Sequence, residues 1–163
     1  MLYVEQIHQY YRFFYDKNIG VNMIPFDADF SRYKVVVAPV LYMVKEGMAE
    51  ALTEYVKNGG ILITTFMSGI VDQSDNVHLG GYPGPLKEIA GVWVEEIDAL
   101  APEQANAVIF SDGTEAACGL LCDLCIWKGR SAWRNTPPIS MRIPPPLPRI
   151  NLARDILIIS EPI

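Results

Sequence analysis

Hydrophobic residues recur at two different spacings along the first hundred positions, and this alternation predicts strands separated by helices. Residues 34–39 (KVVVAP) and 61–65 (ILITT) are short apolar runs, typical of parallel strands buried on both faces. A shorter apolar run at 21–24 predicts another strand. Apolar residues at helical spacing predict helices over residues 3–18 and 44–57. The chain therefore begins as an α/β sequence.

The pattern continues with less regularity after residue 84. It predicts a helix over 85–90, strands over 92–97 and 107–111, and a helix over 114–127. Prolines crowd residues 137–148 and exclude both a helix and a central strand there. Residues 155–160 (DILIIS) can add an edge strand.

Strands that alternate with helices over short connections predict an α/β sheet with right-handed crossovers. In open sheets of this class, ligands and partners meet the loops at the carboxyl ends of the strands. Residues 39–42 and 66–83 both follow such ends. We therefore expect these two segments to lie close together.

The segment 66–83 is a polar loop rich in glycine and proline, and it is long for a compact domain. Its aromatic residues and Gly-Gly and Pro-Gly turns predict an ordered loop packed on the surface. We expect the contacts that define function here, and the candidate interface residues are Ser68, Asp72, Asp75, His78, Gly80, Gly81, Tyr82 and Pro83.

Composition narrows the classes of function. The 163 residues carry a net charge of −6, which argues against nucleic acid as a partner. No apolar run approaches the roughly 20 residues of a membrane span, and no secretory signal is recognisable. The odd count of 3 cysteines fits a reducing compartment. We expect a cytoplasmic protein without a membrane segment.

Charge divides the chain into two parts. Residues 1–124 hold 7 Lys/Arg against 17 Asp/Glu, whereas residues 125–163 hold 6 against 2 and also 7 of the 12 prolines. We predict a folded domain over 1–124 and an atypical basic, proline-rich tail over 125–163. The abrupt change suggests a frameshift or a truncated reading frame near position 124.

The cysteines and acidic loop residues resemble metal ligands only in part. Cys118, Cys122 and Cys125 have a spacing that can hold a four-iron cluster, but on a helix they share one face and are better explained as buried hydrophobes. Asp72 and Asp75, with His78 nearby, are better explained as turn formers than as metal ligands. We expect no metal and no cofactor.

Ser68 is the one candidate nucleophile. It follows the strand-like run 61–65, where a nucleophile elbow would stand, and His78 would be its base. The first glycine of the elbow motif is missing, and no third catalytic group is evident. A turn residue is the favoured interpretation, and we expect no catalytic residue.

The first predicted helix carries more aromatic residues than one buried face needs: Tyr10, Tyr11, Phe13, Phe14 and Tyr15. It is either a core helix or a helix whose surplus face meets another domain or subunit, and both can hold.

Three segments, KVVVAPVLYMV (34–44), YVKNGGILITTFMSGIVD (55–72) and NVHLGGYPGPLKEIAGVWVEEID (76–98), resemble the trimerisation domain of family 42 glycoside hydrolases, which are bacterial β-galactosidases. The resemblance covers residues 3–123. It implies a flavodoxin-like α/β fold similar to class I glutamine amidotransferases, a three-layer sandwich with a mainly parallel sheet and no catalytic cysteine.

The resemblance also implies partners. In the family this domain follows a catalytic barrel, which carries the catalytic glutamates, and helps to assemble a homotrimer. The leading hypothesis is therefore a non-catalytic subunit-association fragment of an enzyme that hydrolyses terminal β-D-galactosides. The alternatives are a stand-alone amidotransferase-like hydrolase that uses Ser68, and a carbohydrate-binding module that stacks sugars on Tyr82 and Trp93.

Overall fold

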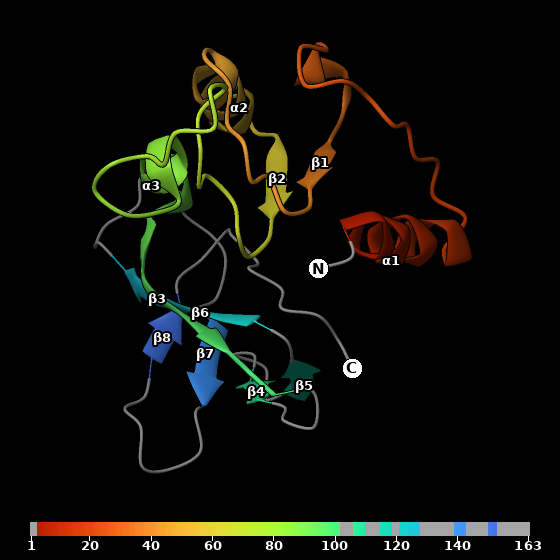
Figure 1. Ribbon diagram of the computed structural model, residues 1–163. Helices are drawn as coiled ribbons and strands as arrows, with labels where there is room; N and C mark the ends of the chain where they lie inside the picture. Colours follow the sequence, from red (N-terminus) through yellow and green to blue (C-terminus); the bar gives the residue numbers. More distant parts are fainter. Residues whose placement is uncertain are drawn as a thin grey trace.

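The computed structural model describes residues 3–101, 106–109, 115–118, 121–127, 139–142 and 150–152. Figure 1 shows α2, α3 and the β1–β2 pair in the upper half of the molecule, strands β3 to β8 below them, and α1 to one side. The elements are α1 (Tyr3–Asp16), η1 (Phe30–Arg32), β1 (Val35–Ala38), α2 (Met48–Lys57), β2 (Ile61–Thr64), η2 (Gly84–Leu86), α3 (Lys87–Ala90), β3 (Val92–Ala99), β4 (Asn106–Ile109), β5 (Glu115–Cys118), β6 (Leu121–Trp127), β7 (Ile139–Arg142) and β8 (Ile150–Leu152).

A parallel β-α-β unit forms the upper half. β1 pairs in parallel with β2, and α2 crosses between them. The apolar face of α2 is buried because Met48, Leu52 and Tyr55 recur at helical spacing. Phe30 of η1 meets the Tyr55 ring edge to face, with centroids 6.2 Å apart. These side chains pack with Leu62 of β2 in one hydrophobic core.

The remaining described strands pair antiparallel. β3 pairs with β6, and β5, β4, β7 and β8 form a second sheet in that order. The α/β class is therefore confirmed, but among the described strands only β1 and β2 are parallel. Parallel neighbours need a crossover of a dozen or more residues. The five residues between the neighbouring strands β4 and β5 are too few for one.

Most predicted elements in residues 3–101 are present, with α1, β1, α2, β2, α3 and β3 close to their expected bounds. The strand predicted at 21–24 is wrong, because this segment has no regular structure and pairs with no described strand. A strand needs partners for its backbone groups. Val21 and Met23 lie exposed instead.

The helix predicted over 114–127 is also wrong, because β5 and β6 occupy that segment. β6 pairs along its whole length with β3, so that Val92 faces Trp127 and Ala99 faces Leu121. Long-range pairing overrode the helical spacing of the cysteines.

Residues 137–148, expected to exclude a central strand, contain β7 between β4 and β8. Its four residues carry no proline, so every ladder N–H is retained. The strand predicted at 155–160 lies outside the described residues. No helix in the described part of the chain has both the length and the apolar character that a membrane span requires.

Candidate functional site

The segment 66–83 is an ordered loop that lies against the chain leaving β1. The amides of Gly69 and Ile70 donate to the carbonyls of Leu41 and Tyr42 at 2.8 and 2.9 Å. The amide of Val44 donates back to the Val71 carbonyl at 2.9 Å. The expectation that 39–42 and 66–83 lie together is confirmed, and these bonds fix the base of the loop.

Ser68 is a structural residue at this base. Its hydroxyl donates to the Thr65 carbonyl at 2.7 Å and accepts from the Leu41 amide at 3.1 Å. The Thr64 hydroxyl oxygen lies 2.7 Å from the Ser68 oxygen and 3.3 Å from the Ala38 carbonyl oxygen, so either hydroxyl can be the donor of the Thr64–Ser68 hydrogen bond. Ser68 is 5% exposed. Its hydrogen-bonding capacity is filled, so the geometry does not support a nucleophile.

Replacing Ser68 by alanine should lower the free energy of unfolding by about 2 kcal/mol, because three buried polar groups lose one shared partner. Urea unfolding with an unchanged m-value measures the loss. Ser74→Ala is the matched control, because Ser74 is exposed, and it should change stability by less than about 0.5 kcal/mol. Equal stability of both variants would contradict the structural role.

Asp72 organises the turn that follows. Its Oδ1 accepts hydrogen bonds from the amides of Ser74 at 2.8 Å and Asn76 at 3.0 Å. The backbone bonds of Asn76 and Ser74 lower the pKa of the Asp72 carboxyl. Asp75 occupies the left-handed region at φ 62°, where aspartate is tolerated. Both residues act as the turn formers that the sequence favours.

His78 and Ser68 line different hollows in the structure. Its amide donates to the Ile70 carbonyl at 3.0 Å, and its buried Nε2 atom has no hydrogen-bond partner. The ring lines a groove of about 220 Å³ at the N-terminal end of α2, together with Asp72 and Gln73. Within the described ranges, no three acidic, histidine or cysteine side chains gather closely enough to hold a metal ion.

The end of the loop packs on β3. The Tyr82 carbonyl accepts from the Val94 amide at 2.9 Å. Gly81, at φ 82°, passes so close to Trp93 that an added Cβ would lie 2.8 Å from the indole Nε1. The Lys87 ammonium covers the Trp93 ring at 5.8 Å from its centroid. Tyr82 and Trp93 are half-buried, so neither presents a fully exposed aromatic ring on which a sugar could stack.

The tip of the loop displays apolar side chains that the sequence analysis left out. Leu79 is 97% exposed and Val77 is 59% exposed. The tip is nevertheless held, because Val71 and Val77 form a β-bridge and the Lys87 ammonium donates to the Gly80 carbonyl. The sequence did contain a signal for this exposed tip, because two apolar residues stand one position apart within a polar, glycine-rich loop.

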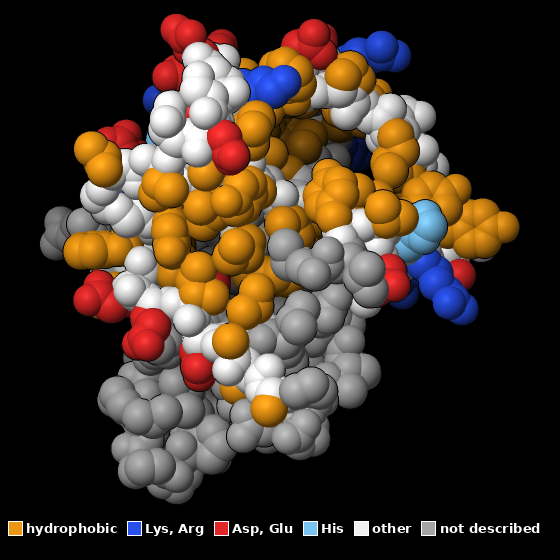
Figure 2. Space-filling model, in the orientation of Figure 1, with side chains coloured by type: hydrophobic (Ala, Val, Ile, Leu, Met, Phe, Trp, Pro, Cys, Tyr) orange, Lys and Arg blue, Asp and Glu red, His pale blue; other side chains and the backbone are white. Residues whose placement is uncertain are grey.

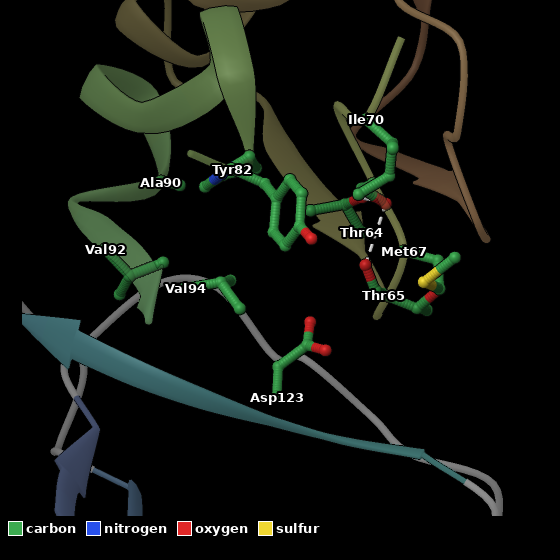
Figure 3. A pocket seen from close by; sticks show the side chains of 11 residues that line it. Thr64, Thr65, Met67, Ile70, Tyr82, Ala90, Val92, Val94 and Asp123 are labelled. Atoms are coloured by element: carbon green, nitrogen blue, oxygen red, sulfur yellow. Dashed lines mark hydrogen bonds between the residues drawn. The ribbon is translucent and has the colours of Figure 1, made fainter. Parts of the chain in front are cut away.

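A small cavity lies below the loop, between β2 and β6 (Figure 3). Asp123 points into it from β6, and Thr64, Tyr82 and Val94 surround it. Its free volume of about 10 Å³ is close to one water molecule. Asp123 is 5% exposed, and its Oδ1 has no hydrogen-bond partner. Burial raises the pKa of this carboxyl to about 6.

Cys125 lies two residues further along β6 and is buried. Burial, and the nearby Asp123 charge to a lesser degree, raise the pKa of its thiol to about 12. The thiol is therefore protonated at neutral pH and behaves as a small hydrophobic side chain, as the sequence favoured. Cys118 lies in β5 and Cys122 in β6, so the three cysteines do not share one helix.

α1 buries little of its aromatic surface among the described residues. Gln6 is its one buried side chain, whereas Tyr11, Phe13 and Tyr15 are exposed. The Tyr11 and Tyr15 rings stack with centroids 6.0 Å apart. Figure 2 shows hydrophobic side chains at the margin where Figure 1 places α1. The surplus aromatic face of the sequence is therefore open to a partner.

Comparison with known proteins agrees with this geometry. A family model described as the β-galactosidase trimerisation domain matches residues 1–135. The chain belongs to this family. A β-galactosidase of Lactobacillus acidophilus is 55% identical over 122 residues, covering 75% of this chain and 18% of its own length. One from Clostridium perfringens is 49% identical over 133 residues, covering 78% and 19%.

Solved structures of the trimerisation domain's relatives show the same arrangement. The β-galactosidase of Bacillus circulans sp. alkalophilus superposes with a TM-score of 0.77 at 41% identity, over 86% of this chain and 23% of that one. Gan42B, a GH42 β-galactosidase, superposes with a TM-score of 0.73 at 34% identity, over 85% and 21%. The chain spans about a fifth of the length of the curated relatives it matches.

Proposed function

We propose that this trimerisation domain joins subunits of a family 42 β-galactosidase, and that the loop 66–83 and α1 are its contact surfaces. The observation that carries this is the exposed, rigidly held Leu79 at the loop tip. Because the backbone on both sides of Leu79 is already held, a partner that covers this side chain has less backbone entropy to overcome. The aromatic residues of α1 add apolar area of the kind that interfaces favour.

The parent enzyme, in this proposal, hydrolyses terminal β-D-galactosides with two carboxylates that lie outside this chain, in a catalytic barrel. Its partners are other copies of itself, in a homotrimer, and it works in the cytoplasm in carbohydrate metabolism. The flavodoxin-like, amidotransferase-like architecture remains part of the proposal, supported by the parallel β1–β2 pair with α2.

The domain division is also a proposal. A unit over 1–124 and a basic tail over 125–163 are supported by the change of charge near residue 124. β6 runs across that position and pairs with β3 on both sides of it, with a shift of register between Val94 and Glu96, and the family match extends to residue 135. Reading the encoding DNA in its neighbouring frames tests the frameshift, because a family-like continuation must appear in one of them.

Replacing Leu79 by aspartate should abolish association. A charge in a desolvated contact costs enough to weaken the trimer by at least about a hundredfold. Light scattering coupled to size exclusion measures this. The unsubstituted 163-residue chain should show about three times its 18.2 kDa mass, and the Leu79→Asp variant should show the mass of one chain.

Two further variants make this result specific. Ile61→Thr, an exposed change outside both surfaces, should leave the mass unchanged. Tyr15→Ser on α1 separates the two contact surfaces, because it lowers the mass only if α1 also contributes. If the unsubstituted chain stays monomeric at high concentration, the domain does not associate without the rest of the enzyme, and this part of the proposal is contradicted.

A further inference from the structure

The turn that joins α2 to β2 contains the one Asn-Gly pair in the sequence, Asn58-Gly59. Both residues are exposed at the C-terminal end of the helix. Gly59 has a φ of 93°, and the space that a side chain would occupy there is open. Because glycine has no side chain to shield its backbone nitrogen, the Gly59 nitrogen is the nearest nucleophile to the amide carbon of the Asn58 side chain. Asparagine is a thermolabile residue for this reason.

The closed end of α2 holds this nitrogen away from the side chain. The Gly59 amide donates to the Val56 carbonyl at 2.9 Å and the Gly60 amide to the Tyr55 carbonyl at 3.0 Å, which are the two bonds of a Schellman motif. A Cβ on Gly60 would lie 2.2 Å from the Tyr55 ring, so the turn packs closely on the helix. Asn58 has a ψ of 9°, which nearly eclipses the Gly59 nitrogen with the nitrogen of Asn58 and not with its Cβ.

We propose that Asn58 is a modification site, which deamidates when the last turn of α2 opens. In the open turn, hydroxide removes the proton of the Gly59 amide, and the Gly59 nitrogen attacks Cγ of Asn58. The N–Cγ bond forms as the bond from Cγ to the side-chain nitrogen breaks, and that nitrogen leaves as ammonia. Water then opens the succinimide at Cγ to give aspartate, or at the backbone carbonyl to give isoaspartate. The net reaction consumes one water and releases one ammonia.

The last turn of α2 is the part of this helix that opens most readily. The buried side chains of α2 end at Tyr55, whereas Val56 is half-buried and Lys57 and Asn58 are exposed. Opening the turn therefore breaks a few exposed backbone hydrogen bonds and uncovers little apolar surface, which is the condition for local opening without unfolding of the domain. The site lies outside the loop 66–83 and α1, so it goes beyond subunit association and does not depend on it.

Both products weaken the turn. Aspartate places a negative charge at the C-terminal end of α2, where the helix dipole favours a positive one. Isoaspartate adds a methylene to the main chain before Gly59, so the close contact of Gly60 with Tyr55 is lost. The start of β2 depends on this turn, because the Tyr55 hydroxyl donates to the Ile61 carbonyl at 3.3 Å and the Ile61 amide to the Lys34 carbonyl at 3.0 Å. The modified chain should unfold at a lower urea concentration.

Mass spectrometry of the 163-residue chain, aged at about pH 8 in increasing urea, tests the site. Trypsin releases residues 58–87 as one peptide, and its fragment ions distinguish Asn58 from Asn76, which valine follows and which is the internal control. Asn58 should deamidate in the native chain while Asn76 does not. The rate at Asn58 should rise in urea below the unfolding transition and be about tenfold or more higher in the unfolded chain. Labelling by an isoaspartate methyltransferase should follow the same order.

Asn58→Gln is the matched variant. It keeps an exposed amide at the end of α2 but needs a larger ring to react, so ageing should leave its mass and its urea midpoint unchanged, whereas the unsubstituted chain should lose stability. Three results would overturn the proposal: equal rates at Asn58 in the native and unfolded chains, an intact Asn58 in the native chain after the unfolded chain has fully reacted, and a rate that stays constant in urea until the whole domain unfolds.

Discussion

Replacing Gly69 by alanine is expected to destabilise the domain by about 3 to 5 kcal/mol. Gly69 lies at φ 67°, where a side chain costs about 1 kcal/mol. A Cβ at this position would also overlap the carbonyl group of Pro83, which is backbone and has no rotamer to escape into. Relieving the overlap requires a backbone shift at Gly69, whose amide donates to the Leu41 carbonyl, or at Pro83, whose carbonyl accepts from the Leu86 amide.

Gly80→Ala is the matched control. Gly80 also has a positive φ, 88°, but the nearest atom to its added Cβ is the Lys87 ammonium nitrogen at 3.8 Å. Gly80→Ala should therefore lose only the stability that a side chain costs at positive φ, about 1 kcal/mol. Urea unfolding of both variants gives the difference between them. Equal losses would mean that the close approach of Gly69 to Pro83 contributes nothing to stability.

Replacing Asp123 by asparagine should stabilise the domain in a pH-dependent way. The carboxyl has a usual pKa of 3.8, and burial raises it to about 6 in the folded state. The folded state therefore binds the proton more tightly than the unfolded state, so stability falls as pH rises through this window. The loss of stability that comes from ionising this buried carboxyl is absent below about pH 4 and grows between pH 4 and 6. Above pH 6 it is complete, at about 3 kcal/mol.

Asparagine keeps the shape of the side chain and removes the charge. The free energy of unfolding of the variant should equal that of the unsubstituted chain near pH 4 and exceed it by up to about 3 kcal/mol at pH 7. Urea unfolding across pH 4 to 8 measures the difference. Asp98→Asn, an exposed change on the paired strand β3, is the control and should differ by less than about 0.5 kcal/mol throughout. A pH-independent difference for Asp123→Asn would show that burial does not perturb this carboxyl.

The candidate site was predictable where local sequence carries the signal. The loop 66–83 followed from its glycines and prolines, and Ser68 and Asp72 take the turn roles that short polar residues favour. Leu79 was missed because whether an apolar residue in a loop is buried depends on what the rest of the chain covers. Asp123 was missed as a site residue because its segment was assigned to a helix, whereas in β6 it faces the cavity.

The apolar runs and helical spacings alone determined β1, α2 and β2, because each of these segments has one periodicity and the three follow one another closely along the chain. Only the tertiary structure decided the segments that need a distant partner. Residues 121–127 became a strand because β6 pairs with β3, and residues 115–118 because β5 pairs with β4. Residues 21–24 stayed irregular because no described neighbour accepts their hydrogen bonds. A strand is stabilised by backbone groups elsewhere in the chain, and its own sequence does not encode whether they are present.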